Sequence, residues 1–171
     1  MQTLYGIADM NGSLIRLQSA RSQSTLGERL RKIMLLNASV SRDGEAARQH
    51  AKRFVSHSVS GWPDDVLEAK GIDPQPIGAV RRAYADNRGV DYAASLTPDR
   101  AVDRLIIAGT PADCTERIAE LFSVAAADEF TQIVIGVPLG PDVSEVIELW
   151  GKEILSALRE PGYSVLTGIE G

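Results

Sequence analysis

Two stretches of the chain are nearly continuous apolar runs, and each stops at a cluster of small or turn-forming residues. Residues 33–40 (IMLLNASV) and 131–137 (TQIVIGV) have this pattern, which is typical of strands buried on both faces of a parallel sheet. A helical pattern follows each run, as in βα units. The order of the elements therefore predicts an α/β fold with parallel strands.

The segment after the first predicted strand has the apolar spacing of a helix. Asp43 precedes it as a candidate N-cap, and Glu45 falls in the first turn, where the helix dipole favours an acid. We expect its buried face to be the stripe of apolar residues at helical spacing, namely Ala47, Ala51, Phe54, Val55 and Val59.

Residues 61–110 predict several short helices, each bounded by Gly or Pro. One is expected to start at Pro63 and to end at Gly71, and another covers 74–84 with apolar residues at i, i+3 and i+7. Thr97 precedes a proline and predicts the N-cap of a third helix. We expect that helix to continue through the LIIA segment until the next glycine.

Two longer helices complete the pattern. Thr110 is expected to cap the first of them, and a helix from about Val143 to Leu158 follows the second strand. The buried face of the first is predicted to contain Cys114, Ile118, Leu121, Phe122 and Ala125.

The two ends of the chain have less regular patterns. Leu4–Ala8 predicts a short strand, residues 16–32 a polar helix broken at a glycine, and residues 163–167 a short edge strand or a disordered tail. The length of 171 residues predicts that residues 1–171 form a single domain.

Composition narrows the classes of function. The formal net charge of −5 argues against a nucleic-acid partner, which requires a basic surface. No apolar run approaches the roughly 20 residues that span a bilayer, and the N-terminus has no signal-peptide pattern. The single cysteine, Cys114, fits a reducing compartment, so we expect a cytoplasmic protein.

The loop from Gly136 to Asp142 (GVPLGPD) is the first candidate site. At the carboxyl end of a parallel strand, backbone N–H groups and the next helix N-terminus face a common space that suits a polar or anionic ligand. Gly136 and Gly140 would allow close approach to the backbone. Alternatively, the two prolines only stiffen a turn, and Asp142 or Ser144 caps the next helix.

Asn37 and Ser39 end the other predicted strand. If both strands belong to one parallel sheet, these side chains open on the same rim as Gly136. The alternative is that Ser39 and Ser41 only help to turn the chain into the next helix.

The remaining reactive side chains favour structural roles. His50 and His57 are seven residues apart on one predicted helix, about 10 Å along its axis, which is too far for one metal ion, so no metal site is expected. Cys114 lies on an apolar stripe and predicts a buried, inert thiol. Asp64, Asp65, Asp99 and Asp103 are most simply first-turn acids of helices. The residues alone indicate an α/β ligand-binding protein without an evident base or nucleophile.

The order of these motifs resembles a known family. The segments DDVLEAKGIDPQPIGAVRRAY, LTPDRAVDRLIIAGTPADCTERIAELF and FTQIVIGVPLGPDVSEVIELWGKEIL are similar to the C-terminal portion of the luciferase-like superfamily. Within it they are most similar to the deazaflavin-dependent branch of methylenetetrahydromethanopterin reductase. The resemblance covers residues 33–160, and its most specific pieces are IAGTP, GVPLGPD and LWGKEIL.

This resemblance implies a partial (β/α)8 TIM barrel with a helical insertion at residues 61–108. A whole barrel needs about 250 residues, so the front strands, which supply most cofactor contacts in the family, are not matched, and residues 1–32 fit no family motif. Three outcomes are open: a homodimer, a pair with a separately encoded N-terminal half, or a truncated product that packs as an open sheet without activity.

The resemblance also implies an oxidoreductase that transfers hydride between the deazaflavin coenzyme F-420 and a small organic substrate. One alternative is a flavin mononucleotide (FMN)-dependent monooxygenase of the same superfamily, and the other is a non-catalytic assembly module made of a partial barrel. No catalytic residue is assigned. The residues expected to contact the cofactor are Asn37, Ser39, Gly136, Pro138, Leu139 and Gly140.

Overall fold

The computed structural model describes residues 32–125 and 130–159. The elements predicted at Leu4–Ala8, in residues 16–31 and at residues 163–167 lie outside the described residues, as do the side chains of Phe122 and Ala125.

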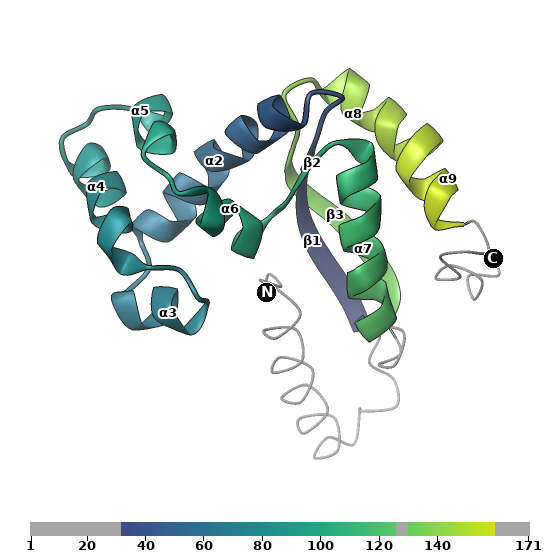
Figure 1. The fold of residues 1–171 in the computed structure, drawn as a ribbon, viewed down its shortest axis with the longest axis horizontal. Helices are drawn as coiled ribbons and strands as arrows, with labels where there is room; N and C mark the ends of the chain where they lie inside the picture. Colours follow the sequence, from purple (N-terminus) through teal and green to yellow (C-terminus); the bar gives the residue numbers. More distant parts are fainter. Residues whose placement is uncertain (1–31, 126–129, 160–171) are drawn as a thin grey trace, which may run out of the picture.

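Three parallel strands form the sheet, in the order β2-β1-β3 (Figure 1). β1 spans Lys32–Val40, β2 spans Ile107–Gly109 and β3 spans Phe130–Leu139. β3 pairs with residues 32–39 of β1 from its first residue to its last, whereas β2 pairs only with residues 38–40 of β1. The α/β class, the two parallel strands and the partial TIM-barrel architecture are confirmed.

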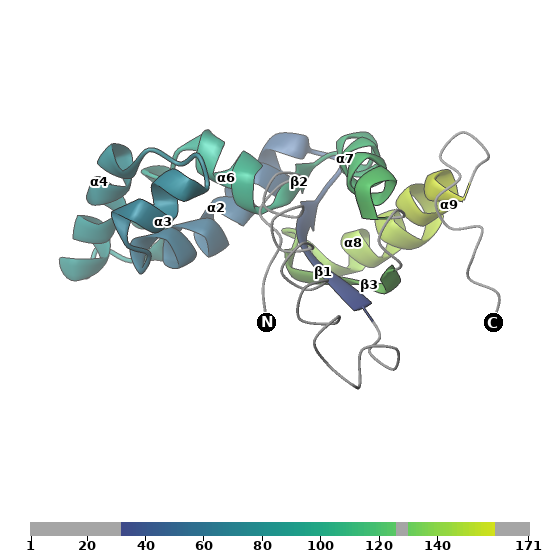
Figure 2. The same ribbon diagram turned by 90° about the horizontal axis from the view of Figure 1, so that it is seen from below.

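One face of the sheet is covered by the helices that follow β2 and β3. Figure 2 shows α7 (Pro111–Ala125) and the helix after β3 on the same side of the β1–β3 pair. Alternate residues of the strands face these helices, as the two-residue period of a strand requires. The core between them contains Leu36, Ala38, Val40, Ile107, Cys114, Ile118, Leu121, Val146, Leu149, Trp150, Ile154 and Leu158, with Ile135 and Leu139 packed against it.

A helical insertion between β1 and β2 has its own core. It comprises α2 (Gly44–Ser60), α3 (Asp64–Ala69), α4 (Pro74–Ala85), α5 (Val90–Ser95) and α6 (Asp99–Leu105). These helices extend to one side of the sheet in Figure 1. Their buried residues form two clusters: Ala51, Val55, Val59, Leu67, Ile72, Ile77, Ala101, Val102, Leu105 and Ile106 in the larger, and Val80, Ala83 and Ala93 in the smaller.

The hydrogen bonds at the first turns of the helices test the N-caps predicted from the sequence. Asp43 Oδ1 accepts hydrogen bonds from the backbone N–H groups of Glu45 and Ala46, which confirms it as the N-cap of α2. Thr110 is confirmed as well, because its hydroxyl accepts from the N–H of Asp113 while the Asp113 carboxylate accepts from the Thr110 N–H and hydroxyl. This reciprocal arrangement is a capping box.

Two predictions in the insertion are wrong. Thr97 is not the cap of α6: its buried hydroxyl donates to the carbonyl of Ala93, and Pro98 takes the cap position without a side-chain hydrogen bond. The LIIA segment does not continue the helix either. α6 ends at Leu105, and Ile107 begins β2, because the end of β1 offers free backbone groups to pair with.

The final helix, predicted from Val143 to Leu158, is confirmed but contains an irregular turn. It consists of α8 (Val143–Leu149), a π-helical turn η3 (Trp150–Ile154) and α9 (Leu155–Leu158). Asp142 Oδ1 accepts from the N–H groups of Ser144 and Glu145, so Asp142 rather than Ser144 caps it. No helix in the described ranges is both long and apolar enough to cross a membrane.

Candidate functional site

Asn37 and Gly136 lie opposite each other on the sheet face that points away from α7. They are register partners in the parallel β1–β3 pair, so the predicted shared rim is confirmed. A Cβ built on Gly136 would lie 2.7 Å from Asn37 Oδ1 and 3.1 Å from Leu35 Cδ1. The Asn37 carboxamide therefore occupies the space that any other residue at 136 would fill.

The surroundings of this pair are apolar and partly exposed. Leu35 and Val134 lie two residues before Asn37 and Gly136, on the same face by strand period, and Val134 is 38% exposed. The Asn37 carboxamide makes no hydrogen bond to another described residue. Sequence reasoning missed Leu35 and Val134, although the alternation along each strand was a signal that could have found them.

The end of β3 departs from regular strand geometry beside this face. Asn37 pairs with Gly136 and Ser39 with Leu139, so Val137 and Pro138 together oppose one residue of β1, which is a β-bulge. The Val137–Pro138 peptide bond is cis. Leu139 has φ +71°, and the N–H of Gly140 donates to the carbonyl of Pro138 at 2.9 Å. A non-glycine residue with positive φ in such a tight turn is a strained position, of a kind that clusters at binding sites.

Gly140 has a structural reason to be glycine. Its φ is +149°, and a Cβ there would collide with the carbonyl oxygen of Val40 and with the side chain of Val146. The loop of residues 136–142 thus contains two kinds of glycine. Gly136 leaves room on the open face, whereas Gly140 lets the turn pack against β1 and α8.

The two serines after Asn37 are engaged within the protein. Ser39 is fully buried and its hydroxyl donates to the carbonyl of Ala47 in α2 at 2.7 Å. The hydroxyl of Ser41 donates to Glu145 of α8 at 3.1 Å and accepts from the Asp43 N–H. Both contacts orient the start of α2 relative to the rim.

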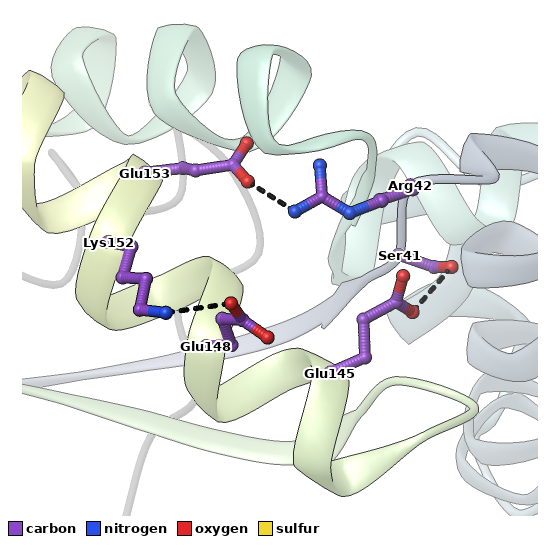
Figure 3. Close-up of polar contacts among 6 residues, drawn as sticks. All are labelled: Ser41, Arg42, Glu145, Glu148, Lys152 and Glu153. Carbon is purple, nitrogen blue, oxygen red and sulfur yellow. Dashed lines mark hydrogen bonds and ion pairs between the residues drawn. The ribbon is translucent and has the colours of Figure 1, made fainter.

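Figure 3 shows how the helix after β3 is tied to the loop after β1. Besides the contact between Ser41 and Glu145, Arg42 pairs with Glu153 at 2.7 Å. Within the helix, Lys152 pairs with Glu148 at 2.8 Å. The two ion pairs are exposed and contribute little stability. Only the Ser41–Glu145 and Arg42–Glu153 contacts connect the helix with the loop after β1.

The structure agrees with the structural roles predicted for Cys114 and for Asp99, the first-turn acid of α6. The prediction for Asp103 is wrong, because it lies beyond the first turn and pairs with Arg48 of α2. Burial raises the pKa of Cys114 to about 12, so its thiol is protonated at neutral pH. His57 is exposed and lies edge-on to the Tyr84 ring. Lys52, on α2, holds the pKa of Asp99 below its usual value through an ion pair of 2.7 Å. Within residues 32–125 and 130–159, no group of three or more His, Cys, Asp or Glu is placed to hold a metal ion.

Comparison with known proteins identifies several relatives that share one name. The chain is 38% identical over 117 residues to the 5,10-methylenetetrahydromethanopterin reductase of Methanolobus tindarius, covering 68% of this chain and 35% of that protein. It is 40% identical over 127 residues to the reductase of the same name from Archaeoglobus fulgidus, covering 71% and 36%. For the Methanopyrus kandleri reductase the identity is 32% over 122 residues, covering 71% and 34%. No family model matches the chain.

A solved structure gives the same indication. The coenzyme F-420-dependent tetrahydromethanopterin reductase from Methanopyrus kandleri superposes with a TM-score of 0.76 and 25% identity, over 91% of this chain and 44% of that chain. The chain spans about a third of the length of its curated relatives. The chain therefore resembles the C-terminal portion of the luciferase-like superfamily, and within it the deazaflavin-dependent methylenetetrahydromethanopterin reductases.

Proposed function

We propose that the chain forms the back part of the cofactor site of a deazaflavin-dependent oxidoreductase, which transfers hydride between coenzyme F-420 and a small organic substrate. The relatives of 32–40% identity are named 5,10-methylenetetrahydromethanopterin reductases, and the similar solved structure is a coenzyme F-420-dependent reductase. The observation that carries the proposal is the side-chain-free position at Gly136, next to the Asn37 carboxamide on the open face of the sheet.

The residues present fit a planar ring system. Gly136 exposes backbone on this face, Leu35 and Val134 provide apolar walls, and Asn37 provides a donor and an acceptor. The Asn37 carboxamide oxygen lies against the side-chain-free position at Gly136. Cofactor sites are lined mainly by apolar side chains with a few placed polar groups, and the described residues of this face have that composition.

The roles of the chain's own residues follow from these positions. Asn37 would hydrogen-bond a polar edge of the ring, while Pro138, Leu139 and Gly140 would border the site at the end of β3. Ser39, whose donor is already used, would act by holding α2 in place. The deazaflavin supplies the hydride chemistry when bound, and the protein contributes orientation and exclusion of water.

The proposed site needs additional protein. Within the described residues, β1 lacks a neighbour beside its first six residues on the β2 side, and β3 has a neighbour on one side only. Free strand edges pair with other chains unless they are covered. We propose that a second copy of the chain or a separately encoded N-terminal half supplies the missing strands and the groups for proton transfer, and that the assembled enzyme is cytoplasmic.

Two alternatives are kept. An FMN-dependent monooxygenase would bind its cofactor on the same open face. None of the described residues on that face distinguishes FMN from coenzyme F-420. A non-catalytic assembly module is favoured by one observation: Leu35, Asn37, Val134 and Gly136, which lie on that face, include no acid or base.

The test compares cofactor binding by matched glycine variants. The purified chain is titrated with coenzyme F-420 and separately with FMN, with fluorescence quenching and thermal shift as readouts. Gly136→Val should weaken binding by at least about tenfold, because its side chain displaces Asn37 and fills the face. Gly61→Val, where a Cβ meets nothing closer than a carbonyl oxygen at 4.0 Å, is the control and should bind normally.

Each outcome of these titrations favours one of the candidate functions over the others. Tighter binding of FMN than of F-420 would favour the monooxygenase. A chain that binds neither cofactor, also when mixed with a candidate N-terminal half, would favour the assembly module. If Gly136→Val unfolds the protein without a separate effect on binding, the glycine only serves the turn.

A further inference from the structure

Three arginines from two helices line a recess beside β2, on the side of β1 opposite to β3. It has a volume of about 440 Å³ and lies between α6, β2 and the first turns of α7. Arg100 and Arg104 come from α6 and Arg117 from α7, and Ile106, Ile107 and Ala108 form its floor together with Asp103 and Asp113. Three guanidinium groups in one recess are unexpected in a chain of net charge −5.

Gly71 brings two of these guanidinium groups together. Its carbonyl accepts a hydrogen bond from Arg100 Nε at 3.0 Å. Gly71 has φ +68°, and a Cβ on it would lie 2.9 Å from one terminal nitrogen of Arg104 and 3.2 Å from its Nε. The missing side chain thus lets the Arg104 guanidinium lie against the residue that already holds Arg100. Since both arginines also lie one helical turn apart, their like charges repel.

Neighbouring acids offset this charge only in part: Asp113 stays ionised, and Arg117 forms an ion pair with Glu120. Asp103 pairs with Arg48 of α2 at 2.8 Å. Asp113 accepts from the N–H and hydroxyl of Thr110 in the α7 cap, and those hydrogen bonds hold its pKa below the usual value. Arg117 donates to Glu120 through one nitrogen only. Arg104 has no hydrogen bond or ion pair within the described part of the chain.

We propose that this recess binds a small anion that carries phosphate or carboxylate groups. Guanidinium groups match the planar, two-pronged geometry of such oxyanions. Arg104 would make the main contact, Arg100 would be oriented by the Gly71 carbonyl, and Arg117 would close the opposite side. The proposal is independent of the deazaflavin site, which lies on the other side of β1 at the β3 loop.

The test titrates the full chain with inorganic phosphate and, separately, with citrate at low ionic strength, followed by calorimetry. We expect a dissociation constant below about 1 mM for at least one of them and weaker binding in added salt. Tighter binding of phosphate would indicate a phosphate-bearing ligand, and tighter binding of citrate an organic polycarboxylate. Arg104→Gln should weaken binding by about tenfold or more.

Two further variants make the test decisive. Arg117→Gln should weaken binding independently, which covers the case in which Arg104→Gln fails to fold. Arg82→Gln removes an exposed arginine of α4 outside the recess and should leave the affinity unchanged. Wild-type protein that binds neither anion, or binding that all three variants reduce equally, would overturn the proposal.

Discussion

The insertion and the sheet layer bury their apolar residues in different ways. In α2–α6 the buried side chains meet other helices of the insertion, together with Ile106, and form cores of their own. In the β1–β3 pair, one face packs on α7 and α8–α9 while the other carries Leu35, Asn37, Val134 and Gly136. The insertion thus packs its apolar residues mainly within itself, whereas the sheet has apolar side chains on both faces, with Val134 of the second face 38% exposed.

The largest expected effects on stability come from placing the same Ile→Ala substitution in each of the two cores. Ile77→Ala in the insertion and Ile118→Ala under the sheet, which are 0% and 1% exposed, should each destabilise by about 2–5 kcal/mol. Native-state hydrogen exchange should show the loss of protection mainly in α2–α6 for the first and in the sheet layer for the second.

A substitution at an exposed isoleucine is the control for the two core variants. Ile147→Ala, at a position 68% exposed, should change stability by less than about 0.5 kcal/mol. Uniform loss of protection through the whole chain in both core variants would mean that the two regions unfold as one, and the contrast between them would then be wrong.

A smaller effect should distinguish the two glycines of the loop. Gly140→Ala should destabilise by about 1–3 kcal/mol, since the new side chain meets the Val40 backbone at a positive φ. Gly136→Ala should cost less than about 1 kcal/mol, because the ends of the Asn37 and Leu35 side chains can move aside. Thermal melting of both variants measures the difference. Equal losses would show that both glycines serve only the turn.

The smallest effect concerns the cap of α7, which joins the insertion to the sheet layer. Asp113→Ala should cost about 1 kcal/mol at neutral pH, because the Thr110 N–H loses its acceptor. Hydrogen bonds from Thr110 lower the pKa of folded Asp113 below 3.8. Its contribution is therefore complete above pH 3.8 and disappears as the pH falls through the lower, folded-state value.

Urea unfolding of wild type and of this variant between pH 2 and pH 7 would measure the contribution. The two stability curves should converge at the acidic end. A gap that stays constant at every pH would show that the carboxylate charge has no part in the cap.

The elements with strong periodicity were predictable from sequence. The strands at 33–40 and 131–137, the Asp43 and Thr110 caps and the stripe of α2 each depend on local rules, and all are confirmed. The pairing of Asn37 with Gly136 followed from one further assumption, that both strands belong to one parallel sheet.

The failures share a non-local cause. β2 has three residues and forms because the end of β1 pairs with it. A short apolar run in the sequence does not indicate whether such pairing will occur. Thr97 was assigned as a cap because Pro98 follows it, yet the carbonyl of Ala93 competes for its hydroxyl. Likewise, the meeting of Arg100 and Arg104 at Gly71 depends on how α6 packs against the end of α3, which no local pattern encodes.

The π-helical turn at Trp150–Ile154 sets the phase of the last helix. Val146, Trp150, Ile154 and Leu158 recur every four residues and all are buried, although a regular α-helix would rotate such a series by about 40° at each step. The wider turn cancels part of that rotation. Deleting Gly151 would restore regular winding and shorten the step from Trp150 to Ile154 from four residues to three. At about 100° per residue the four buried side chains would then still lie within about 60° of one another, so the π-helical turn accommodates one extra residue without turning the buried face away from α7.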